Sequence, residues 1–328
     1  MTSYRPPLPG AGDFVDWPAD FGQRFTIFID TEEEFDWEAP LSRDARAVNA
    51  IAAMPDAARR FADAGAALTF LVDHPVATDP GAIDHMRRAC EHSGNAIGTQ
   101  LHPWVNPPFD EEVCLVNSFA GNLPVALEAA KLDSLTAAIT DAFGAPRIYR
   151  AGRYGIGPAT LGLLAERGYR FDSSIRAAYD YSGEGGPDFS AHGNRAFRTA
   201  SGVIELPFTT VFTGIARGAG GPLHRAAATL PKGIGALARS GMLSRVALTP
   251  EEMPIADALE AVRVASGEGL PLLNFAFHSP SLQPGHTIFV RDAADLATFW
   301  RWWDAMLELL AQRGIVSASL DDLLAATD

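Results

Sequence analysis

The sequence predicts an α/β protein in which parallel strands form a closed or nearly closed barrel. Short apolar runs alternate with segments of helical spacing along most of the 328 residues. This alternation is typical of a parallel sheet with crossover helices. An ionisable residue lies at or just after the end of six predicted strands, where active sites of α/β barrels are found: Asp30, Asp73, His102, Arg150, Asp172 and His278. Such barrels commonly exceed 250 residues as one domain.

The expected elements follow one another in a regular order. The predicted strands are residues 25–29, 67–72, 96–101, 147–151, 169–171, 270–277 and 315–319. The predicted helices are residues 44–64, 81–93, 124–143, 158–167, 252–266 and 292–313. We expect a leader at 1–23, a barrel domain at 24–328, and an insertion at about 178–248 that covers one barrel end. The insertion includes a predicted hairpin of 196–198 with 203–208.

The overall composition disfavours several classes of partner. The 40 Asp and Glu outnumber the 26 Lys and Arg, and the net charge of −14 disfavours nucleic acid and anionic membranes. No apolar stretch approaches the 18 residues of a transmembrane helix. The first residues have no basic region followed by an apolar run, so we expect no signal peptide and a cytoplasmic location. The oligomeric state is not predicted.

An acidic cluster follows the first strand, in the segment IDTEEEFDW. Asp30 and Glu32 are two residues apart, so on extended backbone they face the same side. Two adjacent carboxylates raise each other's pKa unless a cation lies between them. A divalent metal would let one carboxylate ligate while the other acts as a base. The alternative is an exposed acidic turn.

Three further strand ends carry candidate site residues. Gln100 and His102 share a face in IGTQLHPW, although a histidine before proline can be purely structural. Arg150 in YRAGRYG can hold a carboxylate and lower its pKa, or be an ordinary surface cation. His278 in FHSPS ends a strongly apolar strand, a position suited to a general acid.

Taken in order, these segments resemble the motifs of the polysaccharide deacetylases with NodB homology. The resemblance extends from about residue 24 to 320 and implies a distorted barrel of seven or eight β/α units. It implies removal of acetyl groups from N-acetylhexosamines with a divalent metal, usually zinc. The stretches HPW, NPPF and HSPSLQPGHTIFVRD are similar to the WalW-type subgroup.

The resemblance also implies a role for each motif residue. Asp30 would be the catalytic base, Arg150 would orient it, and His278 would be the general acid. Glu32 would ligate the metal, with Glu33 as the less favoured choice. His102 would be the last ligand of the second motif.

One position departs from the family pattern. The second motif normally supplies two histidines, and here the earlier position is Gln100, or Gly98 at the commoner spacing. An amide oxygen binds zinc far more weakly than imidazole. Gln100 could therefore hold a harder metal, His74 could supply the missing nitrogen, or metal and activity could be lost.

The expected function is metal-dependent removal of an acetyl group from an N-acetylated sugar, either a polysaccharide or its precursor. Aromatic residues near the strand ends could stack on the sugar, or be core. These candidate substrate-binding residues are Trp37, Trp104, Phe109 and Tyr154. Two alternatives remain open: an inactive barrel that binds carbohydrate or regulates, and an amidohydrolase for a small cytosolic amide.

Overall fold

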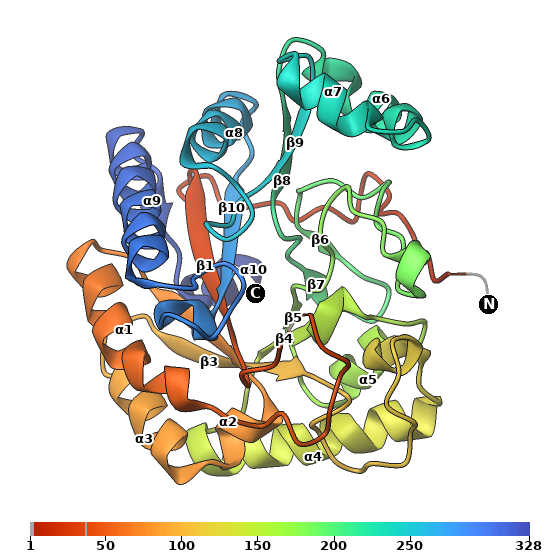
Figure 1. Cartoon of the computed structure of the whole chain (residues 1–328), viewed down its shortest axis with the longest axis vertical. Coiled ribbons are helices and arrows are strands. Elements are labelled where there is room, and N and C mark those ends of the chain that lie inside the picture. The colour runs from red at the N-terminus through yellow and green to blue at the C-terminus, as the bar shows by residue number, and fades with distance from the viewer. Residues whose placement is uncertain (1–2, 37) are drawn as a thin grey trace.

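A curled, mixed sheet forms the centre of the computed structural model, which describes residues 3–36 and 38–328. Its strand order is β10-β1-β2-β3-β4-β5-β7-β6, with β11 paired to β1, and only β6 with β7 is antiparallel. Helices surround this sheet (Figure 1). The distorted α/β barrel predicted from the sequence is therefore confirmed. The strands are β1 (Arg24–Thr31), β2 (Leu68–Val72), β3 (Ala96–Leu101), β4 (Ile148–Ala151), β5 (Phe171–Asp172), β6 (Phe197–Arg198), β7 (Ile204–Glu205), β10 (Leu272–His278) and β11 (Val316–Ser317).

The helices of the outer layer begin at side-chain caps in several cases. Asp73, Asp79 and Asp292 each accept a hydrogen bond from a backbone N–H of the first helical turn, and Ser319 forms a capping box with Asp322. The helices are α1 (Met54–Asp63), α2 (His74–Thr78), α3 (Pro80–Ala89), α4 (Val125–Phe143), α5 (Thr160–Glu166), α8 (Ile255–Gly267), α9 (Ala293–Gln312) and α10 (Leu320–Thr327).

Strand β1 shows why the apolar runs predict parallel strands. Seven of its eight residues are buried, because helices cover one face and the barrel interior covers the other. In register, Asp30 is paired with His278 of β10 on one side and with Leu71 of β2 on the other. Two residues that are 248 positions apart therefore lie at the same level of the sheet. Gln100 and Arg150 are paired in the same way across β3 and β4.

Beyond the edge strand β10, the sheet is continued by non-strand residues, namely 207–209 after β7 and Leu248. Asn274 of β10 donates from Nδ2 to the carbonyl oxygen of Pro207 (2.8 Å), and its N–H donates to Oγ1 of Thr209 (2.9 Å). The backbone of Leu248 bonds to both Thr209 and Ala276. These bonds replace a regular ladder, so the sheet is curled into a nearly complete barrel.

The region predicted as an insertion contains more structure than the sequence indicates. The hairpin is confirmed as β6 with β7. A second sheet of β8 (Thr210–Thr213) and β9 (Ser244–Ala247) carries two helices, α6 (Gly220–Ala228) and α7 (Gly233–Arg239). We call residues 210–247 the arm, which projects from the barrel in Figure 1. Its helices were not predicted because Ala and Gly dominate them and large apolar residues do not recur at helical spacing.

Other differences from the sequence prediction concern element ends and short helices. The helix expected at 44–64 begins with a 3₁₀ turn at Asn49–Ala53, because Glu34 and Ala47 form an isolated β-bridge just before it. Helices α2 and α10 were not predicted. The N-terminal segment lies along β6, with the N–H of Val15 bonded to the carbonyl oxygen of Ala196 (3.0 Å). The division of the chain at residue 23 stays a prediction.

Candidate active site

A pocket of about 710 Å³ opens at the carboxyl ends of the central strands. Six residues that the sequence singled out for catalysis or metal binding line this pocket. They are Asp30, Glu32, Gln100, His102, Arg150 and His278. Two other strand-end acids, Asp73 and Asp172, are buried and do not line the pocket. The parallel register of the strands brings the six together, as the barrel topology predicts.

Asp30 lies between two cationic groups. One carboxylate oxygen, Oδ1, accepts a hydrogen bond from Nη1 of Arg150 at 2.7 Å. The other oxygen, Oδ2, lies 3.7 Å from Nε2 of His278. The Arg150 guanidinium is itself fixed, since its Nε and Nη2 donate to the carbonyl and hydroxyl oxygens of Ser173. The bond between Arg150 and Asp30 is therefore both buried and charge-assisted.

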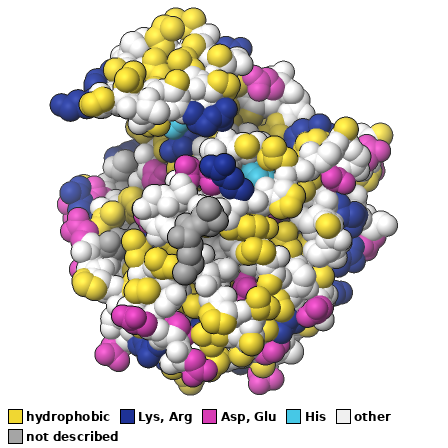
Figure 2. Space-filling view, turned by 90° about the vertical axis from the view of Figure 1, so that its right-hand side faces the viewer, with side chains coloured by type: hydrophobic (Ala, Val, Ile, Leu, Met, Phe, Trp, Pro, Cys, Tyr) yellow, Lys and Arg dark blue, Asp and Glu magenta, His cyan; other side chains and the backbone are white. Residues whose placement is uncertain are grey.

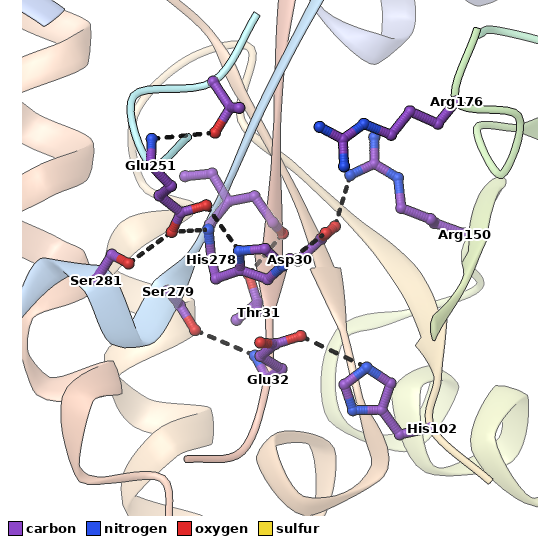
Figure 3. Close-up of polar contacts among 12 residues, drawn as sticks. Asp30, Thr31, Glu32, His102, Arg150, Arg176, Glu251, His278, Ser279 and Ser281 are labelled. Atoms are coloured by element: carbon purple, nitrogen blue, oxygen red, sulfur yellow. Dashed lines mark hydrogen bonds and ion pairs between the residues drawn. The ribbon is translucent and has the colours of Figure 1, made fainter. Parts of the chain in front are cut away.

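His278 is held by a carboxylate that sequence reasoning did not find. Oε2 of Glu251 lies 2.7 Å from Nδ1 of His278. Oε1 of Glu251 accepts two hydrogen bonds, one from the backbone N–H of His278 and one from the hydroxyl of Ser281. Figure 3 shows these bonds on one side of Asp30 and Arg150 on the other. Burial alone would lower the pKa of His278, but Glu251 and Glu32 outweigh it and raise the pKa to about 10. The imidazole is therefore protonated at neutral pH.

Glu251 follows the arm and precedes α8, so it does not end a predicted strand. The double acid Glu251-Glu252 after Pro250 was the only signal for it. Glu252 also lines the pocket and pairs with Arg176, another pocket residue that the sequence did not reveal.

The opposite side of the pocket carries the candidate metal ligands. Oε2 of Glu32 lies 3.5 Å from Nε2 of His102 (Figure 3). Oε1 of Glu32 and Oε1 of Gln100 are buried and have no hydrogen-bond partner in the described part of the chain. Burial, together with neighbouring Glu33, Asp30 and Asp73, raises the pKa of Glu32 well above its usual value.

His102 also belongs to a buried group of three residues, together with Glu33 and Asp73. Ligand atoms of Glu33, Asp73 and His102 lie within 4.8 Å of one another, so this group could hold a metal ion. The side chains of this group also form hydrogen bonds with one another and with backbone N–H groups. Oε2 of Glu33 lies 2.8 Å from Nδ1 of His102, and Asp73 accepts from the N–H groups of Glu33 and Val76. Burial raises the pKa of Glu33 and of Asp73, and contact with Glu33 raises that of Asp73 further.

These contacts fix the orientation of the His102 ring. Burial lowers the pKa of His102 to about 4, so the ring is neutral at pH 7. The Glu33 carboxylate accepts from Nδ1–H, which leaves the lone pair of Nε2 facing Glu32. A carboxylate behind a histidine is the usual arrangement that orients a metal ligand.

The four aromatic residues predicted to bind substrate occupy different environments. Tyr154 lines the pocket. Trp104 is 2% exposed, stacks on His102 with ring centroids 4.4 Å apart, and donates to Glu33 from Nε1. Its ring faces are covered, which argues against stacking on a sugar. Phe109 packs against Arg43 and Lys131 outside the pocket lining, which argues against the same role. Trp37 lies outside the described residues.

His74 does not supply the missing nitrogen. Its Nδ1 lies 3.4 Å from Nη2 of Arg46, and it does not line the pocket. Burial and Arg46 lower its pKa to about 4. Of the three outcomes left open for the second motif, ligation by His74 is therefore not supported.

Solved structures share this fold at low sequence identity. A protein assigned as a polysaccharide deacetylase from Mycobacterium smegmatis matches with a TM-score of 0.52 and 16% identity, over 96% of this chain and 98% of that one. A protein assigned as a glycoside hydrolase/deacetylase from Parabacteroides distasonis matches with a TM-score of 0.56 and 10% identity, over 90% and 68%. The 4-alpha-glucanotransferase from Thermococcus litoralis matches with a TM-score of 0.52 and 10% identity, over 93% of this chain and 40% of that enzyme.

The sequence itself has no such match. No protein-family model matches it, and no curated protein sequence does. In the described part of the chain, every helix is too short or too polar to cross a membrane. The likenesses above establish a shared fold.

Proposed function

We propose that this protein is a metal-dependent hydrolase that removes the acetyl group from an N-acetylated sugar. One observation carries the proposal: Asp30 lies between Arg150 and His278 in a pocket that is also lined by Glu32, His102 and Gln100. A base, an acid and a set of metal donors thus face one space. The sequence resemblance to the polysaccharide deacetylases, and within them to the WalW-type subgroup, supports an N-acetylated sugar polymer or its precursor.

The donor set on the pocket side fits a divalent cation. Glu32 and Gln100 have buried oxygens without partners, and the Nε2 lone pair of His102 faces Glu32. Burial of an acid among other acids is costly, and a divalent cation offsets that cost. We assign Glu32, His102 and Gln100 as the ligands, and Glu33 with Asp73 as the pair that orients His102. A bound metal would polarise the acetyl carbonyl and lower the pKa of water.

The chain's own residues then divide the proton transfers between them. Asp30, held in place by Arg150, takes the proton of the attacking water, whose oxygen bonds to the acetyl carbon. The carbon–nitrogen bond breaks, and acetate and the free amine are the products. His278 gives its Nε2 proton to the departing amine, and Glu251 stabilises the protonated imidazole until then. The pocket volume lies in the usual range for small ligands, and Tyr154 offers an aromatic wall.

Metal content and acetate release together test this proposal. Elemental analysis of the purified protein is expected to find one equivalent of a divalent ion, which is lost in His102→Ala and kept in the control His92→Ala. The same samples should release acetate from N-acetylglucosamine oligomers only when they hold metal. Release from monomeric N-acetylglucosamine alone would favour a small amide as substrate. A metal-free protein that stays inactive after zinc is added would contradict the proposal.

A second candidate function is a sugar-binding barrel without catalysis. Gln100 favours it, because the amide oxygen is a poor zinc ligand where the resemblance leads us to expect imidazole. Saturable binding of N-acetylglucosamine oligomers by a metal-free, inactive protein would support this alternative. The cytoplasmic location expected from the N-terminus stays a prediction.

A further inference from the structure

The arm (residues 210–247) has a charge opposite to that of the whole molecule. All forty Asp and Glu of the chain lie outside it, and the chain as a whole carries a net charge of −14. The basic residues of the arm are Arg217, Arg225, Lys232, Arg239 and Arg245. The arm is therefore a positive projection on a negative protein.

One of these cations fastens the arm to the barrel. Nη1 of Arg245 donates to the carbonyl oxygen of Ala178 at 2.9 Å, and its guanidinium lies 3.6 Å from the ring centroid of Tyr179. Arg176, which lines the catalytic pocket, lies over the same ring at 3.7 Å. The base of the arm is thus joined through Tyr179 to the pocket wall.

The other four cations are exposed and only weakly engaged. Arg217 has Glu268 at 3.8 Å, and Arg225 makes one long bond of 3.4 Å to a backbone carbonyl. Lys232 and Arg239 have no ion pair within the described part of the chain. These side chains remain able to meet an external anion.

Large aliphatic side chains are exposed among these cations. Ile215 is 82% exposed, Leu230 63%, Ile234 40% and Met242 38%. Ile215 and Met242 adjoin the end of the β8–β9 ribbon, where the N–H of Ala216 bonds to the carbonyl oxygen of Met242. In Figure 2 the lobe of α6 and α7 stands clear of the rest of the molecule and shows hydrophobic and basic side chains. Ile215 and Leu230 are the most exposed of the four.

We propose that the arm docks the protein onto an anionic lipid bilayer. Exposed aliphatic groups enter the interface between headgroups and acyl chains, and Lys or Arg beside them pair with lipid phosphates. The chain's acids, all outside the arm, are repelled by the same surface, so charge complementarity also orients the molecule with the arm toward the bilayer. This proposal is independent of the catalytic one, because binding is measured without turnover.

A bilayer fits the arm better than a soluble polyanion does. Single-stranded nucleic acid is bound by basic grooves with aromatic rings on which bases stack. The arm has one aromatic residue other than histidine, Phe212, and that ring packs against His224 and Gly220. The large hydrophobic side chains that the arm exposes are apolar. Such side chains contribute to binding only where they are removed from water.

Vesicle co-sedimentation of the full chain tests the proposal. Vesicles of phosphatidylcholine with phosphatidylglycerol are compared with vesicles of phosphatidylcholine alone, at low and high salt. The charge variant is Lys232→Glu/Arg239→Glu, and the apolar variant is Ile215→Ser/Leu230→Ser. The matched control, Arg301→Glu/Val316→Ser, changes an exposed cation and an exposed aliphatic residue outside the arm.

The wild type and the control are expected to bind the anionic vesicles, with weaker binding at high salt. Each arm variant should bind at least about tenfold more weakly. Equal binding to neutral vesicles, or none to anionic ones, would overturn the proposal even if a variant failed to fold. Binding to a DNA fragment that is unchanged in the apolar variant would also overturn it and assign the arm to a soluble polyanion.

Discussion

Nδ1 of His278 lies 2.7 Å from Oε2 of Glu251, a residue 27 positions earlier that enters the site from the loop before α8. The same carboxylate accepts from the backbone N–H of His278, so it fixes both the ring and the strand end that carries it. This pairing decides the charge of the imidazole that faces Asp30.

Removing the Glu251 charge should lower the pKa of His278. Burial would depress this pKa, and Glu251 is the main group that raises it to about 10. In Glu251→Gln, the imidazole titration followed by NMR in metal-free protein is expected to move below pH 10, toward 6.5. His278 contributes stability that is complete below pH 6.5 and is lost as pH rises through 10, so the variant also loses stability at pH 8.

Ser281→Ala serves as the comparison for this variant, because it removes a bond to Glu251 but leaves the charge in place. An unchanged titration of His278 in Glu251→Gln would show that another group sets the imidazole charge.

Asp30→Asn should abolish turnover while the barrel still folds. Asparagine keeps an oxygen that can accept from Arg150 but cannot take a proton from water, so acetate release is expected to fall by about 10²–10⁴-fold. Circular dichroism should show an unchanged fold. Asp63→Asn, at an exposed acid of α1, is the control and should keep full activity. Retained turnover in Asp30→Asn would remove Asp30 from the role of base.

Gln100→His should increase the affinity of the site for zinc. Gln100 is buried, lines the pocket, and has an unpartnered Oε1, so a histidine there offers imidazole in place of a weak amide donor. Competition with a chromophoric chelator is expected to show an affinity at least about tenfold higher. Gln100→Leu, which offers no donor, should show the opposite change. Equal zinc affinities in the two variants would place the metal elsewhere, for instance at Glu33 and Asp73.

The buried Glu128 should make stability depend on pH. Burial raises the pKa of Glu128 to about 7. The hydrogen bond that the Thr160 hydroxyl donates to this carboxyl group lowers the pKa, but by less than burial raises it. Between pH 4.5 and 7 the unfolded chain loses this proton while the folded chain keeps it, so the free energy of unfolding falls by about 3 kcal/mol as pH rises. Above pH 7 this contribution becomes flat.

Denaturant unfolding of Glu128→Gln at a series of pH values measures this effect. In this variant the free energy of unfolding is expected not to fall between pH 4.5 and 7, so that at pH 8 the variant is more stable than the wild type. Glu91→Gln, at an exposed acid, should follow the wild type. Parallel pH profiles for Glu128→Gln and wild type would show that Glu128 ionises freely in the fold.

The barrel could be predicted from the sequence because its strands are buried on both faces and therefore appear as continuous apolar runs. Sequence reasoning reached Asp30, Arg150 and His278 because each ends such a run. It missed Glu251, which lies in the loop between β9 and α8 and does not end a predicted strand. It favoured Glu32 over Glu33 partly from the alternation of an extended strand, although the chain leaves β1 at Thr31 and that alternation no longer applies there.

Trp104 shows a different limit of the sequence. An aromatic residue after a strand end is compatible with both a ligand surface and a support, and only the packing against His102 distinguishes the two. The arm shows a third limit, because its Ala- and Gly-rich helices lack the periodicity by which helices are recognised.

The two ends of the arm leave the barrel side by side, since Thr210 and Ala247 are paired at its base. An excursion that departs and returns at one point can lengthen, shorten or change its surface without moving the strands that hold Asp30 and His278. The barrel and the arm are therefore free to diverge at different rates. Selection on where the protein works can act on the arm alone, while selection on the chemistry acts on the strand ends.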